Sequence, residues 1–204
     1  MALELGDRLF AAVYDRCLPD SPQAAAWRRQ LLRHAHGVVV EIGAGTGANL
    51  PAYPRVDRLV LTEPSPAMLR RLAPRAAAAG AELIEAAADR LPFVDGSIDT
   101  VVCGLVLCTV PDQAAALDEI RRILRPGGTL LLFEHVRSAD PRAAAWQDRL
   151  DAPWRVAARG CHLNRDTLAA VRAAGFTVEE LHPLQLGMPG ERCVPHIAAV
   201  AAAP

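Results

Sequence analysis

Three glycines at alternate positions form the part of the sequence best suited to holding a ligand. Gly43, Gly45 and Gly47 directly follow the apolar run 37–42. Residues without side chains let a backbone approach a ligand closely, and a helix beginning at Thr46 would direct free N–H groups toward it. We therefore expect an adenosine-containing cofactor at this loop, which also fits the dinucleotide pattern G-x-G-x-x-G/A.

Carboxylates at three further positions are placed to bind the same ligand. Glu63 ends the apolar run 59–62, about 20 positions after Gly43, where a carboxylate can accept hydrogen bonds from both ribose hydroxyls. Asp89 follows the third strand-like run and can accept from the exocyclic amine of an adenine. Glu41 precedes the glycines, where a dinucleotide site normally carries an apolar residue. The loop and Glu63 alone fit both a nicotinamide dinucleotide and a nucleoside methyl donor.

Strand-like apolar runs alternate with helical runs along the chain. Ser65 is the predicted N-cap of a helix at 66–79, and Asn164 is the predicted N-cap of a helix at 167–174. Strands are predicted at 37–42, 59–62, 82–85, 99–103, 129–133, 176–181 and 197–200. This alternation predicts an α/β fold with a doubly wound, mostly parallel sheet.

Several motifs, taken in order, resemble those of class I S-adenosylmethionine-dependent methyltransferases over residues 38–135. They are Glu41 with the glycine loop, Glu63, Ala88-Asp89 ahead of Leu91-Pro-Phe93, and a predicted turn at Pro126-Gly-Gly128 before the fifth strand. The resemblance implies a Rossmann-like seven-stranded sheet whose last strand is antiparallel, and S-adenosyl-L-methionine as cofactor. The cofactor-binding residues that it implies are Glu41, Gly43, Ala44, Gly45, Gly47, Asn49, Glu63, Pro64, Met68, Ala88, Asp89, Arg90 and Leu105.

The whole chain, 1–204, is expected to form a single class I methyltransferase domain. With 204 residues, of which 51% are hydrophobic, it can bury one full core. N-terminal helices are expected at 1–36, the cofactor-binding core at 37–135, a small helical lid with the substrate helices at 136–175, and the closing strands at 176–204.

Motifs beyond the core resemble a narrower family, the methyltransferase-like alkyl thiol S-methyltransferases of animals. They are residues 101–108, 133–136, 160–165 and 195–197, with a helix that carries Trp146 and Trp154. This resemblance implies S-methylation of a small hydrophobic thiol; an O- or C-methyltransferase acting on a phenol, quinone or other small metabolite is the alternative. Those relatives carry an N-terminal membrane anchor, whereas residues 3–18 here predict an amphipathic helix docked on the protein.

His135 is the residue expected to assist chemistry at the methyl acceptor. It follows the fifth predicted strand, at the carboxyl edge where ligands bind in such sheets, and a histidine titrates near neutral pH. The alternative is that His135 simply packs under the lid. Glu134 should point to the opposite face and be structural. The residues expected to line the acceptor pocket are Tyr14, Cys108, Trp154, Cys161, His162 and His196.

Charge, hydropathy and cysteine spacing argue against other classes of function. A formal net charge of −1 gives no electrostatic footprint for nucleic acid. No apolar run approaches the roughly 20 residues that span a bilayer, so no integral membrane segment is expected. Five cysteines without a C-x-x-C pair predict a reduced, cytoplasmic protein with no metal site.

Three alternatives remain open from the sequence. Cys103, Cys108 and Cys161 could bind a thiophilic metalloid as the methyl acceptor. An NAD(P)-dependent oxidoreductase would also use the glycine loop, although Asp89 argues against it. A non-catalytic binding protein is the third alternative, against which the intact loop and Glu63 argue. A homodimer is left open.

Overall fold

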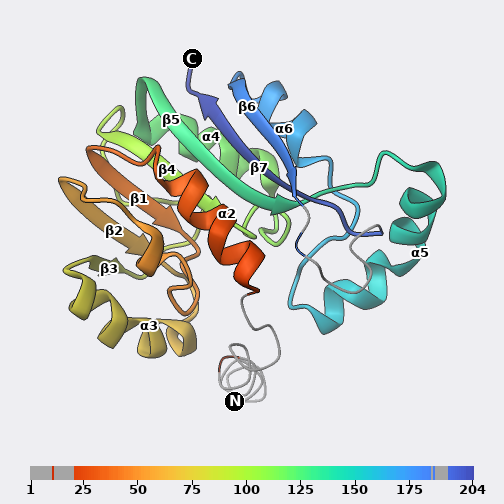
Figure 1. Ribbon diagram of the computed structural model, residues 1–204, viewed down its shortest axis with the longest axis horizontal. Helices are drawn as coiled ribbons and strands as arrows, with labels where there is room; N and C mark the ends of the chain where they lie inside the picture. The colour runs from red at the N-terminus through yellow and green to blue at the C-terminus, as the bar shows by residue number, and fades with distance from the viewer. Residues whose placement is uncertain (1–10, 12–20, 185, 187–192) are drawn as a thin grey trace.

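A mixed sheet forms the centre of the protein in the computed structural model, which describes residues 11, 21–184, 186 and 193–204. Within those residues the sheet has seven strands in the order β3-β2-β1-β4-β5-β7-β6 (Figure 1). β7 is antiparallel to both neighbours, and the remaining neighbouring pairs are parallel. The predicted fold class is confirmed. The strands are β1 (Val38–Ile42), β2 (Arg58–Thr62), β3 (Glu82–Ile84), β4 (Ile98–Gly104), β5 (Leu124–His135), β6 (Thr177–Leu184) and β7 (His196–Ala202).

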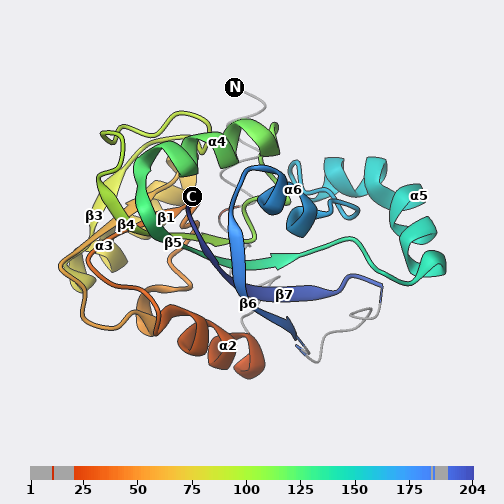
Figure 2. The same ribbon diagram turned by 90° about the horizontal axis from the view of Figure 1, so that it is seen from above.

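Helices cover both faces of this sheet (Figure 2). α2 (Pro22–Leu32) lies on one face, whereas α4 (Gln113–Ile123) and α6 (Thr167–Ala173) lie on the other. α3 (Pro66–Ala79) packs beside β3, and α5 (Pro141–Ala157) stands beyond the sheet, at the end of β5 (Figure 1). Across the part of the chain that the structure describes, none of the helices combines the length and the apolar character needed to cross a membrane.

Burial on both faces explains why the central strands are continuous apolar runs. Val39 and Val40 of β1, Val101 of β4 and Leu131 of β5 are completely buried. Because β1, β2, β4 and β5 are parallel, their carboxyl ends meet at one edge of the sheet. The predicted cofactor residues and His135 all lie on or just beyond that edge.

Local capping chemistry sets the ends of the helices. The Ser65 hydroxyl accepts a hydrogen bond from the Met68 N–H at 3.4 Å, as predicted. The helix predicted at 167–174 forms as α6, but its predicted N-cap was wrong by two residues, because Asp166 is the N-cap and accepts from the Ala169 N–H at 3.0 Å. Asn164 instead donates its side-chain amide to Asp148.

Two backbone segments differ from expectation. Within the described residues, the helix expected from Thr46 is replaced by turns and a single 3-10 turn, η1 (Leu50–Ala52), because Pro51 cannot supply an interior helical hydrogen bond. The predicted turn at 126–128 is instead an irregular start to β5, where Gly127 has a φ of 72°. The helix expected at 3–18 lies outside the described residues, apart from Ala11.

Candidate active site

Two of the three glycines in the glycine loop are required by packing within the protein, because a side chain there would clash with neighbouring residues. A side chain on Gly43 would come within 2.8 Å of Val106, and one on Gly47 within 2.8 Å of Leu72. All three glycines have positive φ. Gly45 differs because no described atom lies within 4 Å of where its Cβ would be. Gly45 is therefore the glycine beside which space is open for a ligand.

Glu63 ties the end of β2 to this loop. One carboxylate oxygen accepts from the Gly45 N–H and the other from the Ser65 N–H, both at 2.9 Å. The side chain is buried, and burial raises the pKa of Glu63 above its usual value. Each carboxylate oxygen has two lone pairs, so Glu63 keeps the capacity to accept from a ligand hydroxyl.

Glu41 binds two side chains of the segment that follows the glycine loop. Its oxygens accept from the Asn49 amide at 2.9 Å and from the Tyr53 hydroxyl at 2.7 Å. Burial outweighs these donors and raises the pKa of Glu41 to about 7. Tyr53 was not predicted as a site residue, and a tyrosine between two prolines gives no sequence signal for this contact.

The predicted cofactor residues outside the glycine loop include several that follow β2 and β3. Ala88 is buried, whereas Asp89 and Arg90 are exposed in a tight turn that follows β3. Pro64 is exposed and Met68 is buried. The exposed carboxylate of Asp89 is thus accessible to a ligand.

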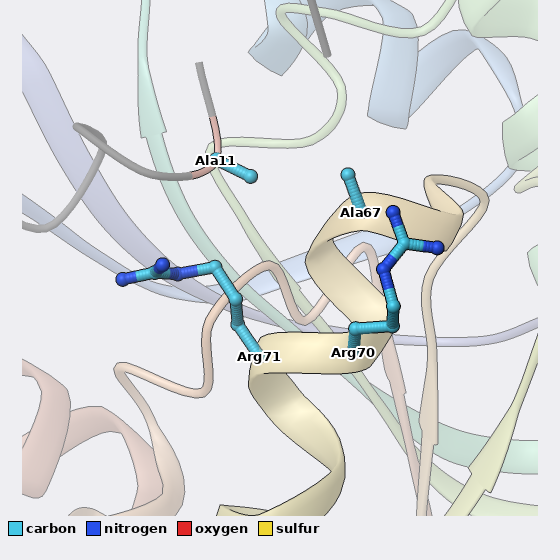
Figure 3. A pocket seen from close by; sticks show the side chains of 4 residues that line it. All are labelled: Ala11, Ala67, Arg70 and Arg71. Carbon is cyan, nitrogen blue, oxygen red and sulfur yellow. The ribbon is translucent and has the colours of Figure 1, made fainter. Parts of the chain in front are cut away.

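A separate pocket lies where the first turns of α3 face Ala11 (Figure 3). The described residues that line it are Ala11, Ala67, Arg70 and Arg71, and none of these four was predicted as a site residue. Met68 packs with Ala11 and Ala67 in the same area. We assign no catalytic role to this pocket.

The loop after β4 is held by a buried carboxylate. Glu134 Oε1 accepts from the N–H groups of Val106 at 2.7 Å and Leu107 at 2.9 Å, and Oε2 accepts from Cys108 N–H at 3.2 Å. Leu105, at the start of this loop, has a φ of 60°, an uncommon conformation for a residue with a side chain. Glu134 was expected to be only structural. The signal for its positioning role was a carboxylate inside an apolar strand.

Cys108, His135 and Cys161 converge from three separate segments. His135 Nε2 lies 2.9 Å from Cys161 Sγ. The three possible ligand atoms all lie within 4.8 Å of one another. Cys103 of the predicted metalloid site is not in this cluster; it is completely buried in the core. We call these three residues the Cys–His cluster.

The surroundings of the two thiols in the Cys–His cluster shift their pKa values in opposite directions. Hydrogen bonds from Cys108 and His135 lower the pKa of Cys161 well below its usual value. The hydrogen bond to Cys161 and burial raise the pKa of Cys108. Arg165 adds positive charge near both thiols and donates to the Leu107 carbonyl at 2.7 Å. Arg165 was not predicted, although it ends the quoted segment 160–165.

The other predicted acceptor residues have mixed positions. His196 pairs with His135 across β5 and β7, and their rings lie edge-on with centroids 5.9 Å apart. Trp154 is hydrogen bonded to Cys161, yet its side chain is half-exposed. The His162 ring nitrogen Nδ1 lies 3.1 Å from the Asp151 carboxylate. The backbone N–H of His162 donates to the Cys108 carbonyl at 2.8 Å. Tyr14 lies outside the described residues.

Comparison with known proteins shows to which family the chain belongs. A family model described as a methyltransferase domain matches residues 40–132. The thiol S-methyltransferase TMT1A of Homo sapiens is 35% identical over 165 residues, which cover 78% of this chain and 68% of that enzyme. The chain belongs to the thiol S-methyltransferase family. Another member, thiol S-methyltransferase TMT1B of Homo sapiens, is 36% identical over 148 residues, and the chain spans only 59% of its length.

The fold of this family member is shared with solved methyltransferase structures. Geranyl diphosphate methyltransferase in complex with S-adenosylmethionine superposes with a TM-score of 0.72 at 16% identity, covering 89% of this chain and 86% of that chain. As a member of its family, the protein is an S-adenosylmethionine-dependent methyltransferase. This membership overturns both the NAD(P)-dependent oxidoreductase and the non-catalytic alternative.

Proposed function

We propose that this enzyme transfers a methyl group from S-adenosylmethionine to the sulfur of a small hydrophobic thiol. The observation that supports the acceptor assignment most is the Cys–His cluster, which places a buried histidine and polarised sulfur atoms at the carboxyl edge of the sheet. Val106, two residues before Cys108, contacts Gly43, so this cluster is connected directly to the glycine loop. The thiol S-methyltransferase names of the relatives support the same acceptor.

The cofactor is proposed to bind between the glycine loop and the residues that follow β2 and β3. Open space at Gly45 would receive its amino-acid part, with Ala44, Asn49 and Leu105 nearby. Glu63 would accept from its ribose hydroxyls with the lone pairs that Gly45 and Ser65 leave unused. Ala88, Asp89, Arg90, Pro64 and Met68 would surround its adenine. When bound, the cofactor supplies an electrophilic methyl group on a sulfonium centre.

The chain's own task is to present the acceptor sulfur as a thiolate and to exclude water. A thiol with an ordinary pKa near ~8.5 is mostly protonated at neutral pH, so it needs modest help. His135 is proposed to supply that help. Its ring is buried, Nε2 faces Cys161, and Nδ1 has no hydrogen-bond partner among the described residues.

Apolar surface on α5 fits a hydrophobic acceptor. Trp146, Leu150 and Trp154 recur every four residues along this helix and are all exposed. Because Trp154 also contacts Cys161, this apolar stripe reaches the Cys–His cluster. An alkyl or aryl thiol could bury its hydrocarbon part against the stripe. A cytoplasmic location remains a prediction from the sequence, and a homodimer stays open.

An acceptor panel with radiolabelled methyl donor tests the proposed function. Alkyl thiols, phenols and quinones of matched size are supplied to the enzyme, to a His135→Ala variant, and to His34→Ala as a histidine control outside the site. We expect label in the thiol products, reduced by about tenfold or more in His135→Ala alone. Preferential labelling of phenols or quinones would replace the thiol with an oxygen or carbon acceptor.

A further inference from the structure

The Cys–His cluster has the composition of a soft-metal site. It is the one place in the described parts of the chain where three possible ligand atoms from histidine, cysteine or carboxylate residues lie within 4.8 Å of one another. Spacing along the sequence predicted no metal site, because each of Cys108, His135 and Cys161 comes from a different segment. Only the fold brings them together.

Two thiolates and one imidazole are a ligand set that suits Zn²⁺. Zinc in catalytic sites is commonly held by three protein ligands, with a fourth position left for water or substrate. The two thiolates would neutralise the 2+ charge of the ion, which reduces the cost of burying it. The cluster supplies three ligand atoms, so one tetrahedral position remains.

Hydrogen bonds within the protein already position the segments that carry these ligands. The Cys108 N–H donates to Glu134, and the Cys108 carbonyl accepts from the His162 N–H at 2.8 Å, which joins the two cysteine-bearing segments. Arg165 donates to the neighbouring Leu107 carbonyl. His135 is fixed on β5 beside His196. Such supporting contacts orient metal ligands and raise affinity.

The geometry requires a small adjustment to admit the ion. Tetrahedral zinc with Zn–S near 2.3 Å and Zn–N near 2.0–2.1 Å separates sulfur and nitrogen by roughly 3.6 Å. His135 Nε2 and Cys161 Sγ are 2.9 Å apart, so they must part by about 0.7 Å. Cys161 lies on an irregular segment between α5 and α6 and is only partly buried, so a change of its χ1 angle can supply this movement.

We propose that Cys108, His135 and Cys161 bind one Zn²⁺ ion, whose fourth position takes the sulfur of the thiol acceptor. This inference rests on the proposed function for the identity of the acceptor, but the metal site stands on the cluster alone. Zinc binding releases to water the thiol protons that Cys108 and Cys161 carry, and it requires the neutral His135 tautomer with its proton on Nδ1. Acceptor binding releases the acceptor's thiol proton to water in the same way. No oxidation or reduction is involved. His135 acts in this arrangement as a ligand.

Metal binding is measured on the full chain, without cofactor or acceptor. The enzyme is stripped with a chelator, supplied with ZnCl₂, and its affinity is read by competition with a chromophoric zinc chelator. CoCl₂ in place of zinc gives a thiolate-to-cobalt charge-transfer band that reports sulfur ligation. We expect one ion per chain, and affinity on the order of a hundredfold weaker in Cys108→Ser, His135→Gln and Cys161→Ser.

Cys193→Ser is the matched control, because Cys193 is partly buried and lies outside the cluster. It should bind zinc like the unmodified chain. A melting-temperature shift with S-adenosylhomocysteine shows that each variant is folded. The proposal is overturned if the unmodified chain binds zinc no more tightly than Cys161→Ser, or if cobalt gives no sulfur band.

Activity separates this inference from the proposed function. Chelator-stripped enzyme should methylate thiols slowly and recover when ZnCl₂ is restored. Full thiol methylation by stripped enzyme would overturn the metal site and leave the proposed function standing. One bound zinc ion with no methylation of any thiol would overturn the proposed function and leave the metal site standing.

Discussion

Glu41, Glu63 and Glu134 each lie at or beside the carboxyl end of a strand, and each is less than a tenth exposed. The hydrogen bonds they accept come from backbone N–H groups and from Asn49 and Tyr53. Each carboxylate therefore fixes a loop that follows a strand. Removing one leaves buried donors unsatisfied, so its loss affects both local order and whatever the loop binds.

Glu63→Ala tests the cofactor end of the site. It removes the acceptor for Gly45 and Ser65 N–H groups and the proposed acceptor for the ribose hydroxyls. S-adenosylhomocysteine should raise the melting temperature of the unmodified chain and have no measurable effect on this variant. Glu82→Ala, which removes an exposed carboxylate paired with Arg58, is the control and should keep the full shift. A full shift in Glu63→Ala would remove Glu63 from the cofactor site.

Glu41 makes stability depend on pH in a direction unusual for a carboxylate. Its pKa of about 7 in the folded chain lies above the value of 4.5 expected when unfolded, so the folded state binds the proton more tightly. This contribution to the free energy of unfolding is fully present below pH 4.5 and falls as pH rises to 7, by a few kcal/mol at most.

Glu41→Gln should therefore match the unmodified chain at pH 5 and be more stable at pH 8. Glutamine can still accept from Asn49 through its oxygen and donate to Tyr53 through its nitrogen. Urea denaturation at pH 5, 6, 7 and 8 measures the difference. Equal pH dependence in both proteins would mean that Glu41 titrates normally.

The loop after β4 is the element on which both halves of the site depend. It begins with Leu105 in a left-handed conformation and ends at Cys108. Val106 touches the glycine loop, whereas Cys108 belongs to the Cys–His cluster. Glu134 holds three consecutive N–H groups of this loop, so one buried side chain sets the position of both halves.

Glu134→Gln should loosen this loop while leaving the sheet intact. Glutamine offers one acceptor oxygen, and its NH₂ group would face an N–H donor of Val106, Leu107 or Cys108. The free energy of unfolding should fall by about 1–3 kcal/mol. Hydrogen exchange at the amides of 106–108 should accelerate, while amides in β1 keep their protection. Unchanged exchange at 106–108 would contradict the role assigned to Glu134.

The ends of a helix could be predicted where the residues that cap it are close in sequence. Ser65 and Gly80 bound α3 as expected, because a hydroxyl cap and a left-handed glycine act within one turn. The short helix expected from Thr46, ending near Pro51, was wrong because this segment forms turns and the 3-10 turn η1 instead. Asn164 and Asp166 are both good caps, and the choice between them depends on Asp148, which is distant in sequence.

At the scale of the whole molecule, the parallel strands bring distant residues to one edge. The cofactor loop could be predicted because its residues are close in sequence. Cys108, His135 and Cys161 were each predicted at the acceptor site. Their mutual contacts could not be predicted, because these depend on how α5 and the segment before α6 pack next to β5. Arg165 and Asp151 were missed as positioning residues for the same reason, because their partners are backbone atoms of other segments.

Ligand selectivity is a property of the whole carboxyl edge. S-adenosylhomocysteine should raise the melting temperature by several degrees, because it binds only the folded chain. NADH at the same concentration should leave the melting temperature unchanged, since the cofactor of this methyltransferase is S-adenosylmethionine. A shift with NADH and none with S-adenosylhomocysteine would contradict the cofactor assignment.

Product analysis with a deuterated methyl donor tests the central claim most directly. The enzyme is given S-adenosylmethionine carrying a trideuterated methyl group and one equivalent of a hydrophobic alkyl thiol, and the products are weighed by mass spectrometry. The account predicts one trideuteromethyl thioether for each S-adenosylhomocysteine formed. S-adenosylhomocysteine formation at the same rate without the thiol, or a label on an atom other than sulfur, would contradict it.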